Sequence, residues 1–150
     1  MGLDNGILLK VRKGKYKLPK FLLRTEENSY SSFGELTELK TYEIAYWRKC
    51  YGLRNDILER TSCKDGKNST LSINDIDSII KIIFERYYTI SGIRSWNTPA
   101  MYNWEYFPYR FREGFEILRN LFYIKWFMKL HPRINKHNHI NYRVYFYDSY

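Results

Sequence analysis

Basic, aromatic and amide residues that suit an anionic ligand lie close together between positions 46 and 55 of this chain. Arg48, Lys49 and Arg54 can hold phosphate oxygens, because a guanidinium offers a planar fork of donors and an ammonium offers a point charge. The remaining members can stack on a base or hydrogen-bond to a base edge or a ribose, and they are Tyr46, Trp47 and Asn55. The stretch therefore predicts a binding site for an anionic small molecule of the nucleotide type. The competing interpretation is an ordinary amphipathic helix that buries Trp47 and Tyr51 and exposes its charges.

Asp4 and Asp148 lie near the two ends of the chain. If the terminal strands pair, both carboxylates belong to one sheet, where they can bind a metal, orient Arg48 or act as acid and base. The more common role of such aspartates is structural, as turn caps or as partners of an arginine. A small metal-dependent hydrolase or nuclease is therefore one alternative function, and both aspartates are candidate ligand-binding residues.

The sequence contains no motif that names a reaction. It has no GxxxxGKS/T phosphate loop, no GxGxxG fingerprint, no HExxH pair and no GxSxG elbow. His137 and His139 would share one face of a strand, but no third metal ligand is evident beside them. Cys50 and Cys63 do not form a CxxC pair, so we expect two free thiols. We therefore expect a protein without catalytic residues, metal ligands or a cofactor.

The charge distribution favours anionic partners. The formal net charge is +9 and the pI is near 9.5. Residues 10–24 carry seven basic side chains and no acid, and residues 119–143 carry six and no acid. Nucleic acid is the less favoured partner, since no helix-turn-helix, zinc finger or RNA-binding aromatic signature is visible. No apolar run reaches the ~18 residues of a membrane span, so we expect no membrane partner and a cytoplasmic location.

Hydrophobic periodicity predicts the elements that must position these residues. The expected strands are 3–12, 20–24 and 140–147. The expected helices are 39–61, one that begins at Ser72, and 109–130. Ser72 and Asp75 form a capping-box-like start for the second helix. The result is a single α+β domain over residues 1–150, in which a small, mainly antiparallel sheet with both terminal strands is covered by three helices.

The segment 91–108 carries Trp96 and Trp104 and is long for a loop inside a compact domain. Its tryptophans are candidate ligand-binding residues, and they also suit a hot spot of a protein interface. A protein-binding inhibitor is accordingly the second alternative function. The apolar arc of the helix at 109–130 is wide, which makes that helix either central to the fold or a surface for homodimer formation.

Three patches of the sequence resemble an uncharacterised family of small phage and prophage proteins of Gram-positive hosts. They are the N-terminal MGLDNGI, the central YWRKCYGLRN with Ile57 and Leu58 after it, and the C-terminal VYFYDSY. A Leu-Ser-x-x-Asp-Ile helix start at 71–76 and a Trp-Glu-Tyr element at 104–106 also resemble that family, so the likeness spans nearly the whole chain. The resemblance implies a phage origin and a single fold, and it lends no activity, substrate or catalytic residue. With it, we expect a phage accessory protein in the host cytoplasm that binds a nucleotide-type signal as a counter-defence sponge, or that inhibits a host or defence protein.

Overall fold

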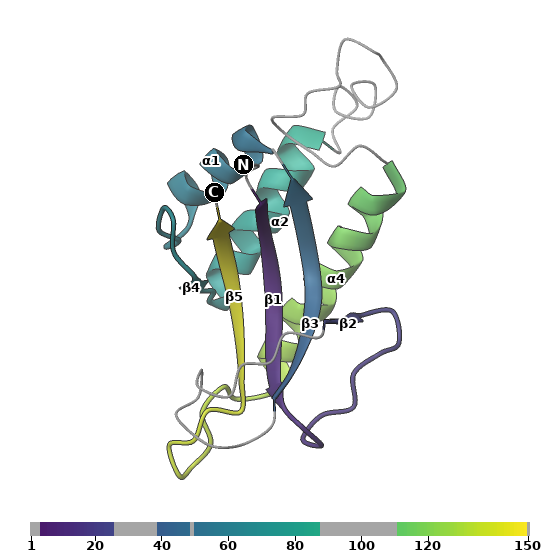
Figure 1. Ribbon diagram of the computed structural model, residues 1–150, viewed down its shortest axis with the longest axis vertical. Helices are drawn as coiled ribbons and strands as arrows, with labels where there is room; N and C mark the ends of the chain where they lie inside the picture. Colours follow the sequence, from purple (N-terminus) through teal and green to yellow (C-terminus); the bar gives the residue numbers. More distant parts are fainter. Residues whose placement is uncertain (1–3, 26–38, 49, 88–110, 150) are drawn as a thin grey trace.

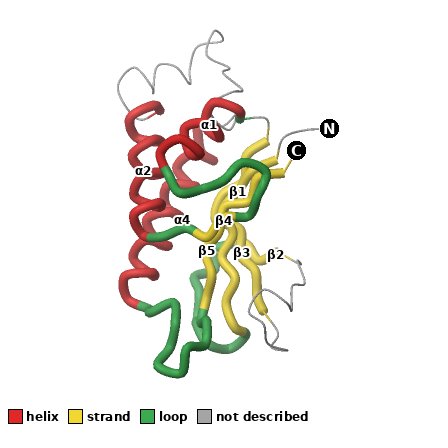
Figure 2. Tube along the Cα trace, turned by 90° about the vertical axis from the view of Figure 1, so that its left-hand side faces the viewer, coloured by secondary structure: helices red, strands yellow, loops and turns green. Residues whose placement is uncertain are grey.

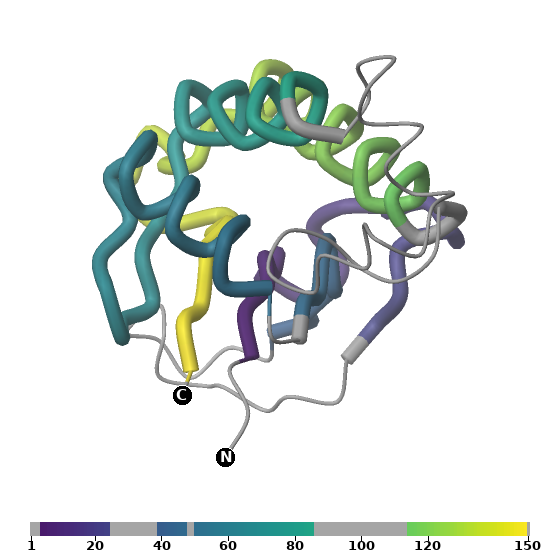
Figure 3. The backbone as a smooth tube through the Cα atoms, turned by 90° about the horizontal axis from the view of Figure 1, so that it is seen from above, coloured from purple at the N-terminus to yellow at the C-terminus, as the bar shows by residue number. Residues whose placement is uncertain are grey.

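The computed structural model describes residues 4–25, 39–48, 50–87 and 111–149, which form one antiparallel sheet and three helices (Figure 1). The strands are β1 (Asp4–Arg12), β2 (Leu23–Thr25), β3 (Leu39–Arg48), β4 (Ser69–Thr70) and β5 (Tyr142–Ser149), in the sheet order β2-β3-β1-β5-β4. The helices are α1 (Tyr51–Arg60), α2 (Ile73–Tyr87) and α4 (Phe111–Leu130). Figure 2 shows these helices on one face of the sheet, and Figure 3 shows them arching over it. The expected α+β class is confirmed.

The N-terminal strand lies at the centre of the sheet and pairs with the C-terminal strand. β1 runs antiparallel to both β3 and β5, and its register places Ile7 opposite Phe146 and Leu9 opposite Val144. Side chains alternate between the two faces of a strand, so these four residues share the face that the helices cover. The expected pairing of the terminal strands is therefore confirmed, and they lie side by side in Figure 1.

The helix predicted at 39–61 is wrong in its first half, because residues 39–48 form β3 and α1 begins only at Tyr51. Strand β3 is rich in Thr, Tyr, Ile and Trp, which pack well on the pleated surface of a sheet, and it pairs with β1 along its length. The register shifts next to Ile7, so that Ile44 is an extra residue in β3, a bulge. The bulge interrupts the alternation of a strand and leaves Ile44 and Trp47, three positions apart, both buried. A spacing of three positions between buried residues is also that of one helical turn, so the sequence pattern predicts a helix where the chain forms a bulged strand.

The predicted start of the second helix is confirmed in atomic detail. Ser72 Oγ accepts a hydrogen bond from the backbone N–H of Asp75 at 3.1 Å, and the Asp75 carboxylate accepts one from the backbone N–H of Ser72 at 3.0 Å. This reciprocal pair is a capping box with Asp in the third position. Helix α4 ends at Leu130, before the proline that follows His131, as the sequence predicts.

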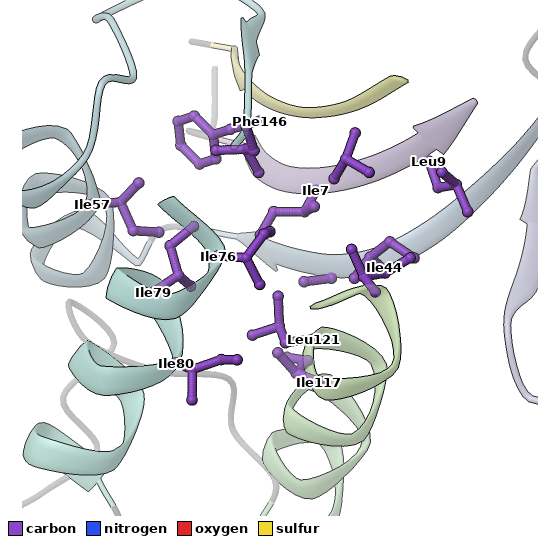
Figure 4. Close-up of a cluster of buried hydrophobic side chains, with 14 of the residues drawn as sticks. Ile7, Leu9, Ile44, Ile57, Ile76, Ile79, Ile80, Ile117, Leu121 and Phe146 are labelled. Carbon is purple, nitrogen blue, oxygen red and sulfur yellow. The ribbon is translucent and has the colours of Figure 1, made fainter. Parts of the chain in front are cut away.

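The core lies between the sheet and the helices (Figure 4). Helix α2 contributes an unbroken aliphatic stripe, which the sequence predicts, and α4 packs beside it. The core members that are at most 1% exposed include Ile7, Ile44, Ile57, Ile76, Ile79, Leu121 and Phe146. Every described helix and the three long strands therefore share one core.

The outer edge of β3 is only partly paired in the described residues. Strand β2, shorter than the edge strand predicted at 20–24, pairs with residues 41–43 alone. Beyond this point the edge of β3 lies next to α4, where the Asn120 amide Nδ2 donates to the Ile44 carbonyl oxygen at 3.0 Å. The described chain thus pairs no strand with residues 44–48 on this side, and a groove runs along the edge.

Candidate functional site

The most densely bonded polar cluster joins both chain ends to α1. The carboxylate of Asp148, whose side chain is 0% exposed, accepts four hydrogen bonds. Oδ1 accepts from Asn5 Nδ2 at 2.5 Å and from Arg54 Nε at 2.8 Å, and Oδ2 accepts from Arg54 Nη2 at 2.8 Å and from the Gly66 N–H at 2.7 Å. Asp65 also accepts from Arg54 Nη2. We call these five residues the Arg54–Asp148 cluster.

The electrostatics of this cluster favour a charged pair. Burial alone would raise the pKa of Asp148, but the hydrogen bonds from Arg54 and Gly66 outweigh it and hold the pKa below its ordinary value. The same bond to Asp148 raises the pKa of Arg54, against the opposing effect of burial. Arg54 Nη1 donates a hydrogen bond to the amide oxygen of Asn55, an exposed residue, at 3.3 Å. The candidate residues Arg54, Asn55 and Asp148 are thus brought together, and the polar atoms of Arg54 and Asp148 are occupied by each other and by their neighbours.

Asp4 does not join this cluster. In the register of β1 and β5 it lies opposite Ser149, whereas Asn5 lies opposite Asp148. Neighbouring residues of a strand face opposite sides of the sheet, so the two candidate carboxylates lie on opposite faces. Asp4 Oδ1 instead accepts a hydrogen bond from Tyr46 Oη at 2.9 Å. The alternative of an Asp4–Asp148 acid–base or metal pair has no geometric support here, and no three His, Cys, Asp or Glu side chains gather into a metal site in the described part of the chain.

The side chains of the other candidate residues are either buried in the core or outside the described residues. Trp47 is 2% exposed and packs in the core, where its ring is not accessible to a ligand, and its Nε1 has no hydrogen-bond partner in the described chain. Arg48 closes β3 and lies opposite Asp4, but its side chain, like the whole of Lys49, is outside the described residues. Trp96 and Trp104 also lie outside the described residues.

Both thiols are free and buried, as expected from the sequence. Burial raises the pKa of Cys50 to about 12, and burial also raises the pKa of Cys63. Thiols with raised pKa values are protonated near neutral pH, and the thiol form is a poor nucleophile. Neither cysteine is therefore suited to covalent catalysis.

A groove of about 490 Å³ runs between the outer edge of β3 and α4. We call it the β3–α4 groove. Among its lining residues are Lys20, Phe21, Glu43, Tyr46, Glu116, Arg119 and Asn120. Of the candidate residues that the structure describes, only Tyr46 lines it. Phe21 and Arg119 are almost a hundred positions apart in the sequence, so no local pattern predicts their contact. Lys20 belongs to the basic segment 10–24, which the sequence alone does identify.

Arg119 is held at the rim of this groove. Its guanidinium carbon lies 4.3 Å from the centroid of the Phe21 ring, a cation–π contact, and its Nε and Nη2 donate to the Asn120 amide oxygen at 3.2 Å and 3.1 Å. Asn120 is itself fixed by its bond to the β3 bulge. On the opposite wall, burial raises the pKa of Glu43. The groove thus combines an ordered cation, an aromatic ring and a half-buried carboxyl group.

A second groove, of about 420 Å³, lies at the start of α2 and is lined by residues that include Ser62, Asp75, His131 and Arg133. Its serine, histidine and aspartate suggest a hydrolytic triad, but the Asp75 carboxylate accepts from the Ser62 Oγ at 2.8 Å, the Ser62 N–H at 3.2 Å and the Ser72 N–H at 3.0 Å. Burial opposes these bonds, yet the pKa of Asp75 is lowered. Asp75 therefore caps a helix and bonds directly to the serine, an arrangement that does not orient a histidine base.

Comparison with protein-family models, curated protein sequences and solved structures finds no match to this chain. Within the described residues, no helix combines the length and the apolarity needed to cross a membrane.

Proposed function

We propose that the protein is a non-enzymatic binding protein that takes an anionic, nucleotide-type ligand in the β3–α4 groove. The observation that carries the proposal is the meeting of a partly exposed aromatic ring and two cations on one groove. Phe21 (37% exposed) suits stacking on a base, and Lys20 and Arg119 suit phosphate oxygens. The volume of about 490 Å³ falls within the range of roughly 300–1,000 Å³ that small-molecule sites occupy.

The two carboxyl groups of the groove, Glu43 and Glu116, restrict which ligand fits. A carboxylate repels phosphate, so the phosphates belong beside Lys20 and Arg119 and the base belongs beside Glu43. Carboxylates accept hydrogen bonds from exocyclic amino groups. Adenine, guanine and cytosine carry such a group and uracil does not, so we expect nucleotides with amino-bearing bases to bind more tightly than uridine nucleotides.

We propose a protein without catalysis because its candidate reactive groups are already hydrogen-bonded, separated from one another or protonated. The Asp148 carboxylate accepts four hydrogen bonds in the interior, Asp4 lies on the other face of the sheet, and the pKa of Cys50 is raised to about 12. With the resemblance to small phage proteins, a nucleotide-binding protein without turnover is best understood as a sponge that removes a signalling nucleotide of the host.

The proposal is tested by titrating the full chain with linear and cyclic mononucleotides and dinucleotides, and by following its melting temperature and the heat of binding. At a ligand concentration of 100 Kd the protein should gain about 2.7 kcal/mol, which raises the melting temperature by roughly 5–10 °C for a chain of this size. Arg119→Gln and Phe21→Ser should each weaken binding at least tenfold. Lys129→Gln, which removes an exposed cation from the same helix outside the groove lining, is the matched control and should bind as the wild type does.

Three results would refute the proposal. The first is no thermal shift with any nucleotide in the panel. The second is a loss of affinity in Lys129→Gln equal to that in Arg119→Gln, which would mean unspecific attraction to the +9 charge. The third is conversion of a bound nucleotide to product, which would make the protein an enzyme.

A further inference from the structure

We propose that the outward side of α4 joins two copies of this chain into a twofold symmetric dimer. Helix α4 is apolar on both sides. Its inner side is buried in the core, and its outer side exposes Phe115 (48%), Phe122 (46%), Trp126 (53%) and Leu130 (56%). A helix that is apolar all round is normally covered all round. We call the residues Phe115, Arg119, Phe122, Trp126, Lys129 and Leu130 the α4 outer face.

The spacing of this face is that of a helix–helix seam. Its exposed residues lie at 115, 119, 122, 126 and 129, at alternating steps of four and three. Steps of four and three recur in coiled coils because they keep one stripe of side chains facing a partner helix. Helix α2 widens the stripe with Phe84, whose ring centroid lies 6.0 Å from that of Phe122. The partner best suited to such a stripe is another helix.

The size of the face fits one side of a dimer interface. An aromatic side chain has about 150–250 Å² to bury, and Phe84, Phe115, Phe122 and Trp126 are each about half exposed. With Leu130 they offer on the order of 450 Å² of apolar area. A standard interface buries about 800 Å² per partner, with an apolar centre and a polar rim. The α4 outer face supplies such a centre, and the cations Arg119, Lys125 and Lys129 supply part of the rim.

The face is complementary to itself in one register. When two such helices pack antiparallel, alternate seam positions meet, which sets Phe115 against Trp126 of the second copy and Arg119 against Phe122 of the second copy. Each layer is then an aromatic pair or a cation–π pair. The neighbouring register, shifted by seven residues, would set Arg119 against Lys129 of the second copy, which like-charge repulsion disfavours. The sequence of the face therefore selects both the second copy as partner and the register.

The oligomeric state tests the proposal. Sedimentation of the full chain between about 1 and 100 µM should reveal a species of twice 18.4 kDa. Trp126→Glu should weaken dimer formation at least 100-fold, because twofold symmetry removes each contact twice. Tyr51→Glu, which places the same charge on a residue that is 48% exposed on α1, is the matched control and should remain dimeric. A wild-type chain that stays monomeric throughout, or a Trp126→Glu variant that dimerises like the control, overturns the proposal.

A cross-linking experiment tests the register. Phe115→Cys and Trp126→Cys are prepared separately, mixed at about 100 µM and oxidised; the native thiols are buried. In the antiparallel register residue 115 is level with residue 126 of the second copy, whereas two copies of residue 115 are eleven positions, or about 16 Å, apart along the axis. Disulfides need Cα atoms within about 7 Å, so only the mixture should cross-link efficiently. Equal cross-linking in either variant alone would overturn the proposed pairing.

Arg119 belongs to both surfaces, whereas Trp126 and Phe115 do not line the β3–α4 groove, so these tests change only residues outside it. A chain that binds nucleotide but never dimerises would refute the dimer proposal and leave the proposed function standing. A chain that dimerises but binds no nucleotide would refute the proposed function and leave the dimer proposal standing.

Discussion

Replacing Asp148 by Asn should destabilise the fold strongly, because the substitution keeps the size of the side chain and disrupts its bonding. Four donors face the two carboxylate oxygens. An amide presents one oxygen and one NH2 group, so in either orientation two of these donors meet a donor. Arg54, whose side chain is 10% exposed, also loses its buried counter-charge. Removing one partner of a buried ion pair costs about 3–5 kcal/mol, and Asp65 remains on Arg54, so we expect about 3 kcal/mol.

Equilibrium unfolding in urea, followed by tryptophan fluorescence, measures this loss directly. Trp47 is 2% exposed and should report the opening of the core. A loss of about 3 kcal/mol lowers the melting temperature of a chain of this length by roughly 6–12 °C. It is also a large share of the 5–15 kcal/mol that typically stabilises a domain.

Asp65→Asn provides the matched control, since it removes a carboxylate from the same guanidinium. The Asp65 side chain is 70% exposed, and exposed ion pairs contribute about 1 kcal/mol or less. If Asp148→Asn costs less than about 1 kcal/mol, or no more than Asp65→Asn, the reasoning that the Arg54–Asp148 cluster fastens the chain ends is refuted.

Three further predictions concern folding. Gly6→Ala should cost about 1–3 kcal/mol in urea unfolding, because the new Cβ would lie 2.6 Å from Tyr147 Oη and 2.5 Å from a backbone oxygen of β3; an unchanged midpoint would contradict the packing. Ser72→Ala should cost about 1 kcal/mol by removing the acceptor for the Asp75 N–H, and a loss under 0.3 kcal/mol, roughly the error of the measurement, would count against the capping box. The pKa values of Asp75 and Asp148 are lower in the folded protein than their ordinary value of 3.8, so the stability they confer is complete above that value and is lost as the pH falls below it. The urea midpoint should therefore fall as the pH drops below about 4, and Asp148→Asn should make that fall smaller.

Local signals in the sequence predict much of the fold. The core-facing residues of β1 and β5 recur at every second position because they contact the face that the helices cover, and the two strands pair without a bulge between them. The Ser72–Asp75 start of α2 depends on residues three positions apart. Such features need no knowledge of distant parts of the chain, so sequence periodicity and spacing are sufficient to identify them.

The features that the sequence does not predict depend on contacts between distant segments. The bulge at Ile44 exists because β3 must match the register of β1, and it removes the alternation that would identify a strand. The β3–α4 groove depends on Phe21 and Arg119, which only the folded chain brings into contact. Of the candidate residues near position 50, Arg54 bonds to Asp148 and Asn55 bonds to Arg54, and their spacing in the sequence does not reveal these bonds.

The three sequence patches MGLDNGI, YWRKCYGLRN and VYFYDSY lie together in the fold, and their contacts restrict where a ligand can bind. Each patch contributes a member of the Arg54–Asp148 cluster: Asn5 from the first, Arg54 from the second and Asp148 from the third. A ligand that used Arg54 would have to separate it from Asp148, and leaving that buried carboxylate without its partner costs about 3–5 kcal/mol, which would weaken binding roughly 10²- to 10⁴-fold. The β3–α4 groove carries no such cost, because the Phe21 ring is already partly exposed in it. The three patches are therefore best explained by closure of the fold, and ligand specificity is best sought in the β3–α4 groove.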